Sequence, residues 1–246
     1  MIVRHVLCIL ICICTLSSCQ IWEKTKSMYR GSILPAKVNV DARPDVGENV
    51  QRLVHVVAPI DMQIERLVES LERMNALSRQ ELESMFSRFP WLNGVGAYTP
   101  SGEVEYQIPA QPVKRLSRQD ILEVLAEEED IYVRYLDLDL GPELCVVKPE
   151  LSGEDIGTYI VAHFDPRSLF TKTTAPESLL VLYQGKILWS GTSSAFNASI
   201  EAKDWRQIQA QGVQGDFQIQ DRKFVWLSRY IGKSPLVYVV YKENAG

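Results

Sequence analysis

Residues 91–108 read WLNGVGAYTPSGEVEYQI, and this stretch decides the fold. Its first part, 91–97, is a short apolar run that predicts a β-strand. The next residues, Thr99-Pro100-Ser101-Gly102, have proline and glycine where a tight turn accepts them. After the turn, apolar side chains alternate at Val104, Tyr106 and Ile108, as in a strand with one buried face. The stretch therefore predicts a β-hairpin, and with it an antiparallel sheet.

Two helices are predicted before the hairpin. Apolar residues recur every three or four positions over 50–74, which predicts a long amphipathic helix over 46–76 that is kinked at Pro59. Two arrangements are open for this stripe: a dimer seam, or packing on the protein's own sheet, which is commoner for a single helix. A capping box over 78–81 predicts a second helix that ends near Phe89. The stripe consists of Val50, Leu53, Val57, Ile60, Ile64, Leu67, Leu71 and Met74.

After the hairpin, the pattern predicts one helix and three strands. Ser117-Arg118-Gln119-Asp120 caps a helix over 118–128, which contains Ile121, Leu122 and Leu125. Apolar runs then predict strands over 131–138, 143–148 and 158–164. The expected fold class is α+β, with an antiparallel sheet that has its helices on one face.

The order of elements then repeats with little sequence identity. Strands are expected over 179–183 and 186–189, a short helix over 204–210, and three closing strands. The closing strands span 216–219, 223–228 and 235–241. We therefore expect the long helix and a first module over 45–170 and a second module over 171–246, joined near Thr171 to Ala175.

The first eighteen residues have the features of a secretory signal peptide. Arg4 and His5 form a short basic region, and an apolar run over 6–16 is too short to span a membrane. The following Leu16-Ser17-Ser18-Cys19 resembles the bacterial lipobox, which implies that Cys19 is acylated, palmitate included, and anchors the chain to a membrane. Residues 19–44 then form a lipidated tether. Gln20 after the cysteine favours the outer membrane over the inner one, so the expected location is the cell envelope, facing away from the cytoplasm.

The composition is typical of a globular protein able to bury a sizeable core. The chain has 246 residues, of which 46% are hydrophobic and 23% charged. Its net charge is −5 and no basic run stands out, so nucleic acid is not expected as a partner. Beyond the signal peptide and Cys19, Cys145 remains; it lies in an apolar strand and is expected to be an inert, buried side chain.

No catalytic or metal-binding motif is found. His55 and His163 are far apart and belong to no HxxH or HExxH pattern, and His163 is expected to be a packed or surface residue. The chain also lacks a GxSxG elbow, a P-loop and a GxGxxG string. We therefore expect no enzyme, no cofactor and no metal site.

The arrangement resembles the double Cache family, extracytoplasmic PAS-like sensor domains with a long N-terminal helix and two small α/β modules. Three passages carry the resemblance: 89–104 is similar to the family's first hairpin, 157–169 to the last strand of its distal module, and 180–189 to the hairpin of its second module. Family members bind a small molecule in the distal module, often an amino acid or a carboxylate. The resemblance therefore implies a small-molecule ligand for this chain.

The resemblance also implies candidate ligand contacts. Tyr135-Leu136-Asp137 matches the family's Tyr-x-Asp, and Asp165 lies where a later aspartate is found. Two carboxylates facing a pocket would bind an ammonium group. The family's Arg-x-Trp-Tyr string is absent, and Arg134 is the nearest cation for a ligand's carboxylate; Tyr98 is expected to line the same pocket. The alternative is a strand whose Asp137 and Asp139 face solvent.

These observations predict an envelope lipoprotein that binds a small polar metabolite and acts through a partner protein. The alternative is a structural or assembly lipoprotein that holds another envelope protein through its surface or through the 50–74 stripe. In that case exposed aromatic residues such as Trp205 and Trp226 would matter more than a pocket. A polar pocket lined by Tyr98, Arg134 and Asp165 favours the first hypothesis, and a collapsed apolar one favours the second.

Overall fold

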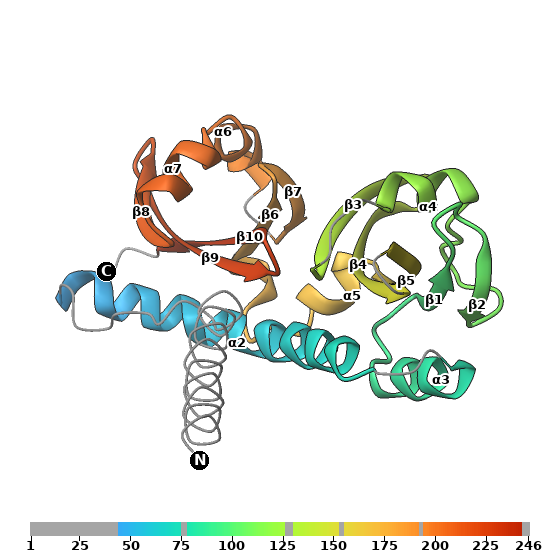
Figure 1. The fold of residues 1–246 in the computed structure, drawn as a ribbon. Coiled ribbons are helices and arrows are strands. Elements are labelled where there is room, and N and C mark those ends of the chain that lie inside the picture. Colours follow the sequence, from blue (N-terminus) through green and yellow to red (C-terminus); the bar gives the residue numbers. More distant parts are fainter. Residues whose placement is uncertain (1–43, 75–77, 126–129, 153–154, 192–193, 243–246) are drawn as a thin grey trace, which may run out of the picture. The chain divides into compact units, whose positions relative to one another are not determined.

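The computed structural model describes residues 44–74, 78–125, 130–152, 155–191 and 194–242. The predicted signal peptide, Cys19 and the tether up to residue 43 lie outside this part of the chain. The described residues form two antiparallel sheets of five strands, with helices packed around them (Figure 1). The expectation of a mixed α and β protein with antiparallel sheets is therefore confirmed.

The first sheet contains the hairpin that the sequence predicts. Its strands lie in the order β2-β1-β5-β4-β3, and all neighbours are antiparallel. The strands β4 and β5 extend well beyond their predicted runs at 143–148 and 158–164. Polar residues continue the pairing between the end of β4 and the start of β5. The strands are β1 (Gly94–Tyr98), β2 (Val104–Ile108), β3 (Tyr132–Leu138), β4 (Gly141–Ser152) and β5 (Asp155–Phe164).

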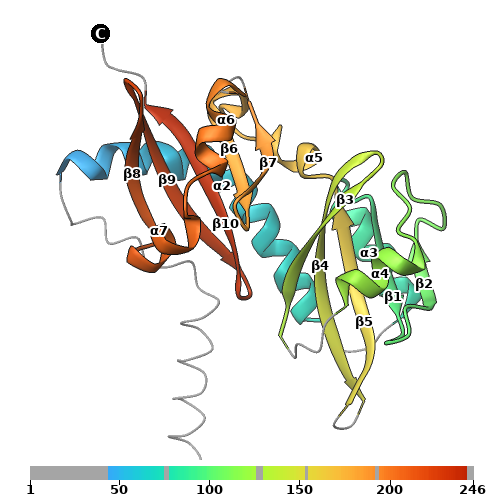
Figure 2. The same cartoon turned by 90° about the horizontal axis from the view of Figure 1, so that it is seen from above.

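The second sheet repeats this strand order. Its strands lie in the order β7-β6-β10-β9-β8, again with antiparallel neighbours, so each strand has a counterpart five numbers earlier (Figure 2). The repeat predicted from the order of elements is therefore present in the sheet topology. The strands are β6 (Leu179–Tyr183), β7 (Lys186–Ser190), β8 (Gln214–Ile219), β9 (Arg222–Ile231) and β10 (Ser234–Lys242).

The helices begin where the sequence provides caps. Ser78 and Ser117 accept hydrogen bonds from the main-chain nitrogens three residues on, and at Ser117 the capping box is complete. Two five-residue helices, α5 and α6, were not predicted, since a single turn is too short to show a periodic pattern. The α-helices are α2 (Pro44–Glu72), α3 (Arg79–Arg88), α4 (Arg118–Val124), α5 (Pro166–Phe170), α6 (Asn197–Glu201) and α7 (Trp205–Gln211), and Pro176–Ser178 and Ser194–Phe196 form 3₁₀ turns.

The apolar stripe of α2 packs on the protein's own sheets. Its eight residues are all at most 6% exposed within this single chain. Asp61 of α2 pairs with Arg229 of β9, whose Nε lies 2.8 Å from Oδ2. Farther along, Lys148 Nζ in β4 donates to the main-chain oxygen of Met74, just after α2, at 2.8 Å. The stripe is therefore not available as a dimer seam or as a docking surface for another protein.

Replacing Leu67 with alanine tests this packing. The Leu67 side chain is fully buried, so the variant is expected to lose about 2–5 kcal/mol of unfolding free energy through lost burial and a cavity. Equilibrium urea denaturation measures the loss. The control is Met62→Ala on the same helix, where the side chain is 49% exposed and the change is expected to stay within about 0.5 kcal/mol. Equal losses in the two variants would contradict the packing of α2.

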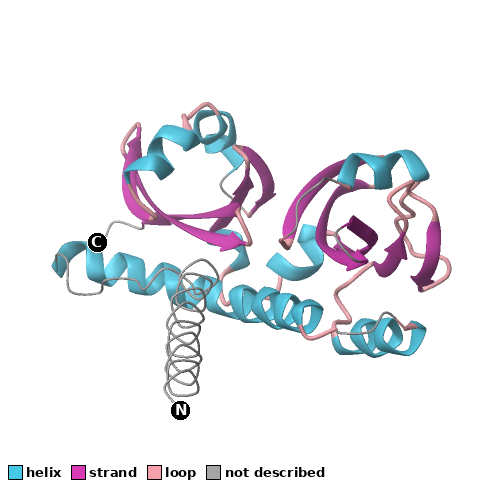
Figure 3. Ribbon diagram, in the orientation of Figure 1, coloured by secondary structure: helices cyan, strands magenta, loops and turns pink. Residues whose placement is uncertain are grey.

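The expectation that helices lie on one face of the sheet is wrong for the first sheet (Figure 3). On one face, α4 contributes Ile121 and Val124 to a core that includes Tyr98 and Cys145. On the other face, Lys148 reaches the end of α2. All five positions of β1 are buried, because the helix α3 packs against this strand as a second covering layer. We call the face covered by α4 the inner face.

The two tryptophans expected at the surface in the scaffold alternative are buried. Trp205 is 4% exposed and Trp226 is 5% exposed, and both belong to the core of the second sheet. Their rings meet edge to face, with centroids 6.1 Å apart, and Trp205 Nε1 donates to the main-chain oxygen of Ile200 at 2.8 Å. That expectation was wrong because Trp205 in α7 and Trp226 in β9 pack against each other in the core rather than face solvent.

Strand β3 is tied to the second sheet through the main chain of Val133. Tyr183 Oη in β6 donates to Val133 O at 2.7 Å, and Val133 N donates to Ser234 Oγ in β10 at 3.3 Å. Side chains of the second sheet therefore engage both main-chain groups of one residue of the first sheet. We call these three residues the Val133 interlock.

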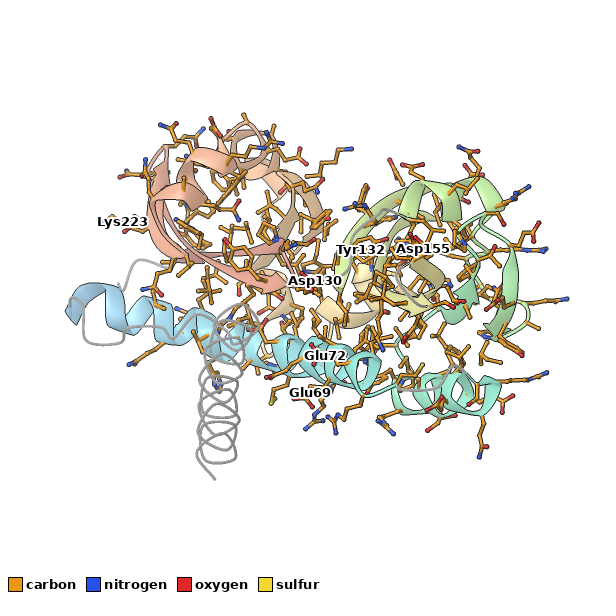
Figure 4. All side chains as sticks on the ribbon, in the orientation of Figure 1. Glu69, Glu72, Asp130, Tyr132, Asp155 and Lys223 are labelled. Atoms are coloured by element: carbon orange, nitrogen blue, oxygen red, sulfur yellow. The ribbon has the colours of Figure 1, made fainter. Side chains whose placement is uncertain are left out.

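Two further contacts flank the interlock. Gly232, in the turn between β9 and β10, lies so close to β3 that a Cβ atom there would be 1.8 Å from Ile131 O. In the same turn, Lys233 Nζ lies 3.3 Å from Oδ2 of Asp130, a residue labelled in Figure 4. The turn and the start of β3 are thus in direct contact.

Candidate functional site

The inner face of the first sheet is mostly apolar. Strand alternation places Tyr98, Tyr132, Cys145 and Val161 on it, beneath α4. Burial raises the pKa of the Cys145 thiol well above its usual value, and the negative charge of Glu143 adds to the effect. Cys145 is therefore a buried, protonated packing residue, as the sequence predicted.

Five polar residues gather at one end of the inner face and interrupt this apolar surface. Glu143 and His163 are fully buried and Lys114 is 5% exposed. The five come from separate segments: the residue before β1, the link between β2 and α4, the strands β4 and β5, and the residue after β5. We call this set the buried polar cluster: Asn93, Lys114, Glu143, His163 and Asp165.

Glu143 is the centre of the cluster. Asn93 Nδ2 donates to both of its carboxylate oxygens at 2.9 and 3.0 Å, and Lys114 Nζ lies 3.2 Å from Oε2. His163 Nδ1 lies 2.7 Å from Oε1. These neighbours offset the cost of holding a charged group away from water, which is several kcal/mol for an unpaired ion.

The second ring nitrogen of His163 has no such neighbour. Nε2 is buried and has no hydrogen-bond partner among the described residues. The ring lies over Gly94 of β1, where a Cβ atom would come within 2.4 Å of Nε2. Since buried polar atoms in folded proteins are nearly always paired, His163 Nε2 stands out among the described polar atoms of the cluster.

Asp165 connects the cluster to the helix that follows β5. Its carboxylate caps α5 by accepting from Arg167 N at 2.8 Å, and it also pairs with the Arg167 side chain and with Lys114 Nζ, the latter at 2.7 Å. Burial alone would raise the pKa of Asp165, but the hydrogen bonds from Arg167 and Lys114 outweigh it and lower the pKa below its usual value. Asp165 is therefore a carboxylate whose oxygens are already engaged.

The five residues predicted to contact a ligand do not all share one face. Tyr98 is 1% exposed on the inner face, and Arg134 lies on the same side of β3, with its guanidinium 4.7 Å from the centroid of the Tyr132 ring. Tyr135 and Asp137 alternate to the opposite side of β3. There the Tyr135 ring lies 5.6 Å from Lys186 Nζ. Tyr98 and Arg134 thus lie on the inner face, and Asp165 lies at its end.

Four members of the cluster were missed as site residues: Asn93, Lys114, Glu143, and His163, which was expected to be a packed or surface residue. Glu143 offered a signal: it lies two residues before Cys145 in β4, so both side chains lie on the same face of the strand, toward the core. Lys114 offered none, because its partners depend on how the link between β2 and α4 folds back over the sheet.

A concave region lies away from the cluster, between the end of α2 and α3. It has a volume of about 310 Å³ and is lined mainly by polar side chains, Arg73 and Arg88 among them. Arg88 Nη1 donates to Ser70 Oγ at 3.1 Å, and Arg73 pairs with Glu69. Its two cations are thus engaged at the surface, so the buried polar cluster remains the stronger candidate.

The described part of the chain contains neither a metal site nor a membrane-spanning helix. No group of three or more His, Cys, Asp or Glu side chains there is arranged to hold a metal ion. No helix in these ranges is both long enough and apolar enough to cross a membrane.

Comparisons by sequence find no match, either among family models or among curated proteins. Comparison of the fold with solved structures finds clear similarity. An extracellular ligand-binding receptor from Desulfohalobium retbaense matches 80% of this chain with a TM-score of 0.54 at 12% identity. This chain spans only 39% of that receptor's length.

Two chemoreceptor domains match over nearly their full length. The ligand-binding domain of the Pseudomonas aeruginosa amino acid chemoreceptor PctC, in complex with GABA, has a TM-score of 0.51 at 12% identity; 82% of this chain and all of that domain are covered. The ligand-binding domain of the Pseudomonas fluorescens chemoreceptor CtaA, in complex with L-isoleucine, has a TM-score of 0.52 at 8% identity, covering 83% of this chain and 96% of that domain. The fold is therefore similar to that of these ligand-binding domains, as the resemblance to Cache-like modules predicted.

Proposed function

We propose that this chain is a lipid-anchored envelope protein that binds a small polar metabolite on the inner face of its first sheet. The binding module comprises residues 45–170, and residues 171–246 form the second PAS-like module. Acylation at Cys19 holds the chain at the membrane, the outer one being favoured. Its output passes through a partner protein, and the chain is not an enzyme.

The observation that carries this proposal is the buried polar cluster with its unpaired His163 Nε2. Small-molecule sites combine a mostly apolar wall with a few polar groups that fix the ligand's orientation. The inner face has this composition: apolar side chains and Tyr98 beneath α4, Arg134 on β3, and the cluster at one end. The likeness to ligand-binding domains of receptors supports the same proposal through the fold.

The scaffold alternative loses two of its supports. Both the α2 stripe and the two tryptophans on which it depended are buried within the chain. The closed packing of the inner face beneath α4 still favours it, because a collapsed apolar interior was its expected mark.

A thermal-shift screen tests the proposal. The full-length chain, purified in detergent, is heated with amino acids, organic acids or purines while tryptophan fluorescence is followed. A compound at 100 times its Kd is expected to stabilise the fold by about 2.7 kcal/mol. If no compound raises the melting temperature, metabolite binding is contradicted for these classes.

Two variants locate the site of any compound that binds. His163→Asn keeps a polar group near the Nδ1 position, where it can still reach Glu143, but removes Nε2; the thermal shift is expected to disappear. The matched control is Asp137→Asn, an exposed carboxylate on the opposite side of β3, which is expected to keep the shift. A shift that survives in His163→Asn would place the ligand away from the cluster.

A further inference from the structure

The side chain of Lys114 reaches into the cluster from outside the sheet. It belongs to the link between β2 and α4, yet it is 5% exposed. Its Nζ lies 3.2 Å from Glu143 Oε2 and 2.7 Å from Asp165 Oδ2. It also donates to the main-chain oxygens of Pro142 at 2.6 Å and Gly141 at 3.2 Å. Two carboxylates and two carbonyls therefore surround one primary ammonium group.

The groups around this ammonium are held independently of Lys114. Glu143 is fixed by Asn93 and His163, and Asp165 is fixed by Arg167 and by its role as the α5 cap. Gly141 and Pro142 belong to β4. The acceptors thus form a preorganised set, which is what a binding site for an ammonium requires. The unpaired His163 Nε2 lies in the same cluster.

We propose that Glu143 and Asp165 form a binding site for a primary ammonium group, and that Lys114 of the same chain is its resident occupant. A free amine cannot enter while Lys114 is in place, because two ammonium groups would compete for the same oxygens. Withdrawal of Lys114 opens the site to an alkylammonium ion. If the proposed function holds, the inner face of the native chain takes ligands that place no ammonium here, such as carboxylates, rather than amino acids held through their amino group.

Chemical rescue tests the resident-occupant proposal. Lys114→Ala lacks three carbons and the ammonium, which together make n-propylammonium. In the full-length chain, this variant is expected to melt below the wild type, and n-propylammonium is expected to raise its melting temperature with saturation. Wild type should show no such rise. Tetramethylammonium, which has no N–H to donate, should have no effect on either protein.

The matched control is Lys148→Ala on β4, where Lys148 pairs with Glu150 and is 16% exposed. Its melting temperature should not respond to n-propylammonium. Equal responses in wild type and Lys114→Ala, the absence of a saturable response in Lys114→Ala, or an equal effect of tetramethylammonium would each overturn the proposal. If Lys114→Ala does not fold by itself, recovery of the folded state on addition of n-propylammonium, followed by tryptophan fluorescence, gives the same test.

The outcome separates this proposal from the proposed function. Rescue of Lys114→Ala without any hit in the metabolite screen would support the ammonium site and leave the metabolite-binding proposal contradicted. An amino acid that stabilises the wild type and competes with n-propylammonium for Lys114→Ala would support metabolite binding. It would contradict the resident-occupant proposal, because the native chain would then admit an amine.

Discussion

The variant Glu143→Ala is expected to lose about 3–5 kcal/mol of unfolding free energy, the usual effect of removing one partner from a buried ion pair. Glu143 is fully buried and contacts Asn93, Lys114 and His163. Its removal leaves buried donors without an acceptor, which adds a desolvation penalty to the lost attraction. Equilibrium denaturation in urea measures this loss.

The control for this variant is Glu150→Ala, on the same strand. Glu150 also pairs with a lysine, Lys148, but its side chain is 31% exposed. Exposed ion pairs contribute at most about 1 kcal/mol, so this variant is expected to stay close to wild type. If both variants lost the same amount of unfolding free energy, the cluster would not be a buried network.

Gly232→Ala is expected to lose about 2–5 kcal/mol. Gly232 has a φ of +57°, and an L-residue in this left-handed region costs about 1–2 kcal/mol. In addition, the new Cβ atom would lie 1.8 Å from Ile131 O, a main-chain atom that cannot move without shifting β3. Overpacking of this kind costs about 1–3 kcal/mol.

The matched control is Gly212→Ala. Gly212 has an extended backbone with φ 168°, and the nearest atom to an added Cβ lies 3.7 Å away, so little change is expected. Thermal and urea unfolding measure both variants. A wild-type melting temperature for Gly232→Ala would show that the turn between β9 and β10 does not press against β3 in solution.

Much of the fold could be predicted because local patterns determine it. The serines at 78 and 117 begin helices where their capping boxes predict, and residues 104–108 form the strand β2. The buried face expected for this strand was wrong, since Val104 and Tyr106 are exposed. The stripe over 50–74 correctly predicted a helix with one buried side. It could not show that this helix covers a second face of the sheets, because periodicity reveals which side is buried and not what buries it.

The candidate site was only partly predictable. Asp165 was found by resemblance, but its engagement by Lys114 is a tertiary contact between a link and a strand end, which no local pattern encodes. Tyr135 and Asp137 could have been separated from the inner face by alternation with Leu136, which is buried. Trp205 and Trp226 were misplaced because a single tryptophan carries no local signal of its burial.

The Val133 interlock has a consequence for how the first sheet meets other chains. Strand β3 lies at one border of that sheet, where free N–H and C=O groups normally invite a strand from another molecule. At Val133 both groups are engaged by Tyr183 and Ser234, and Gly232 packs closely against Ile131, two residues earlier. The second sheet thus blocks the addition of a strand from another molecule at Val133 of β3. The other edge strand, β2, is where the first sheet could still pair with another strand.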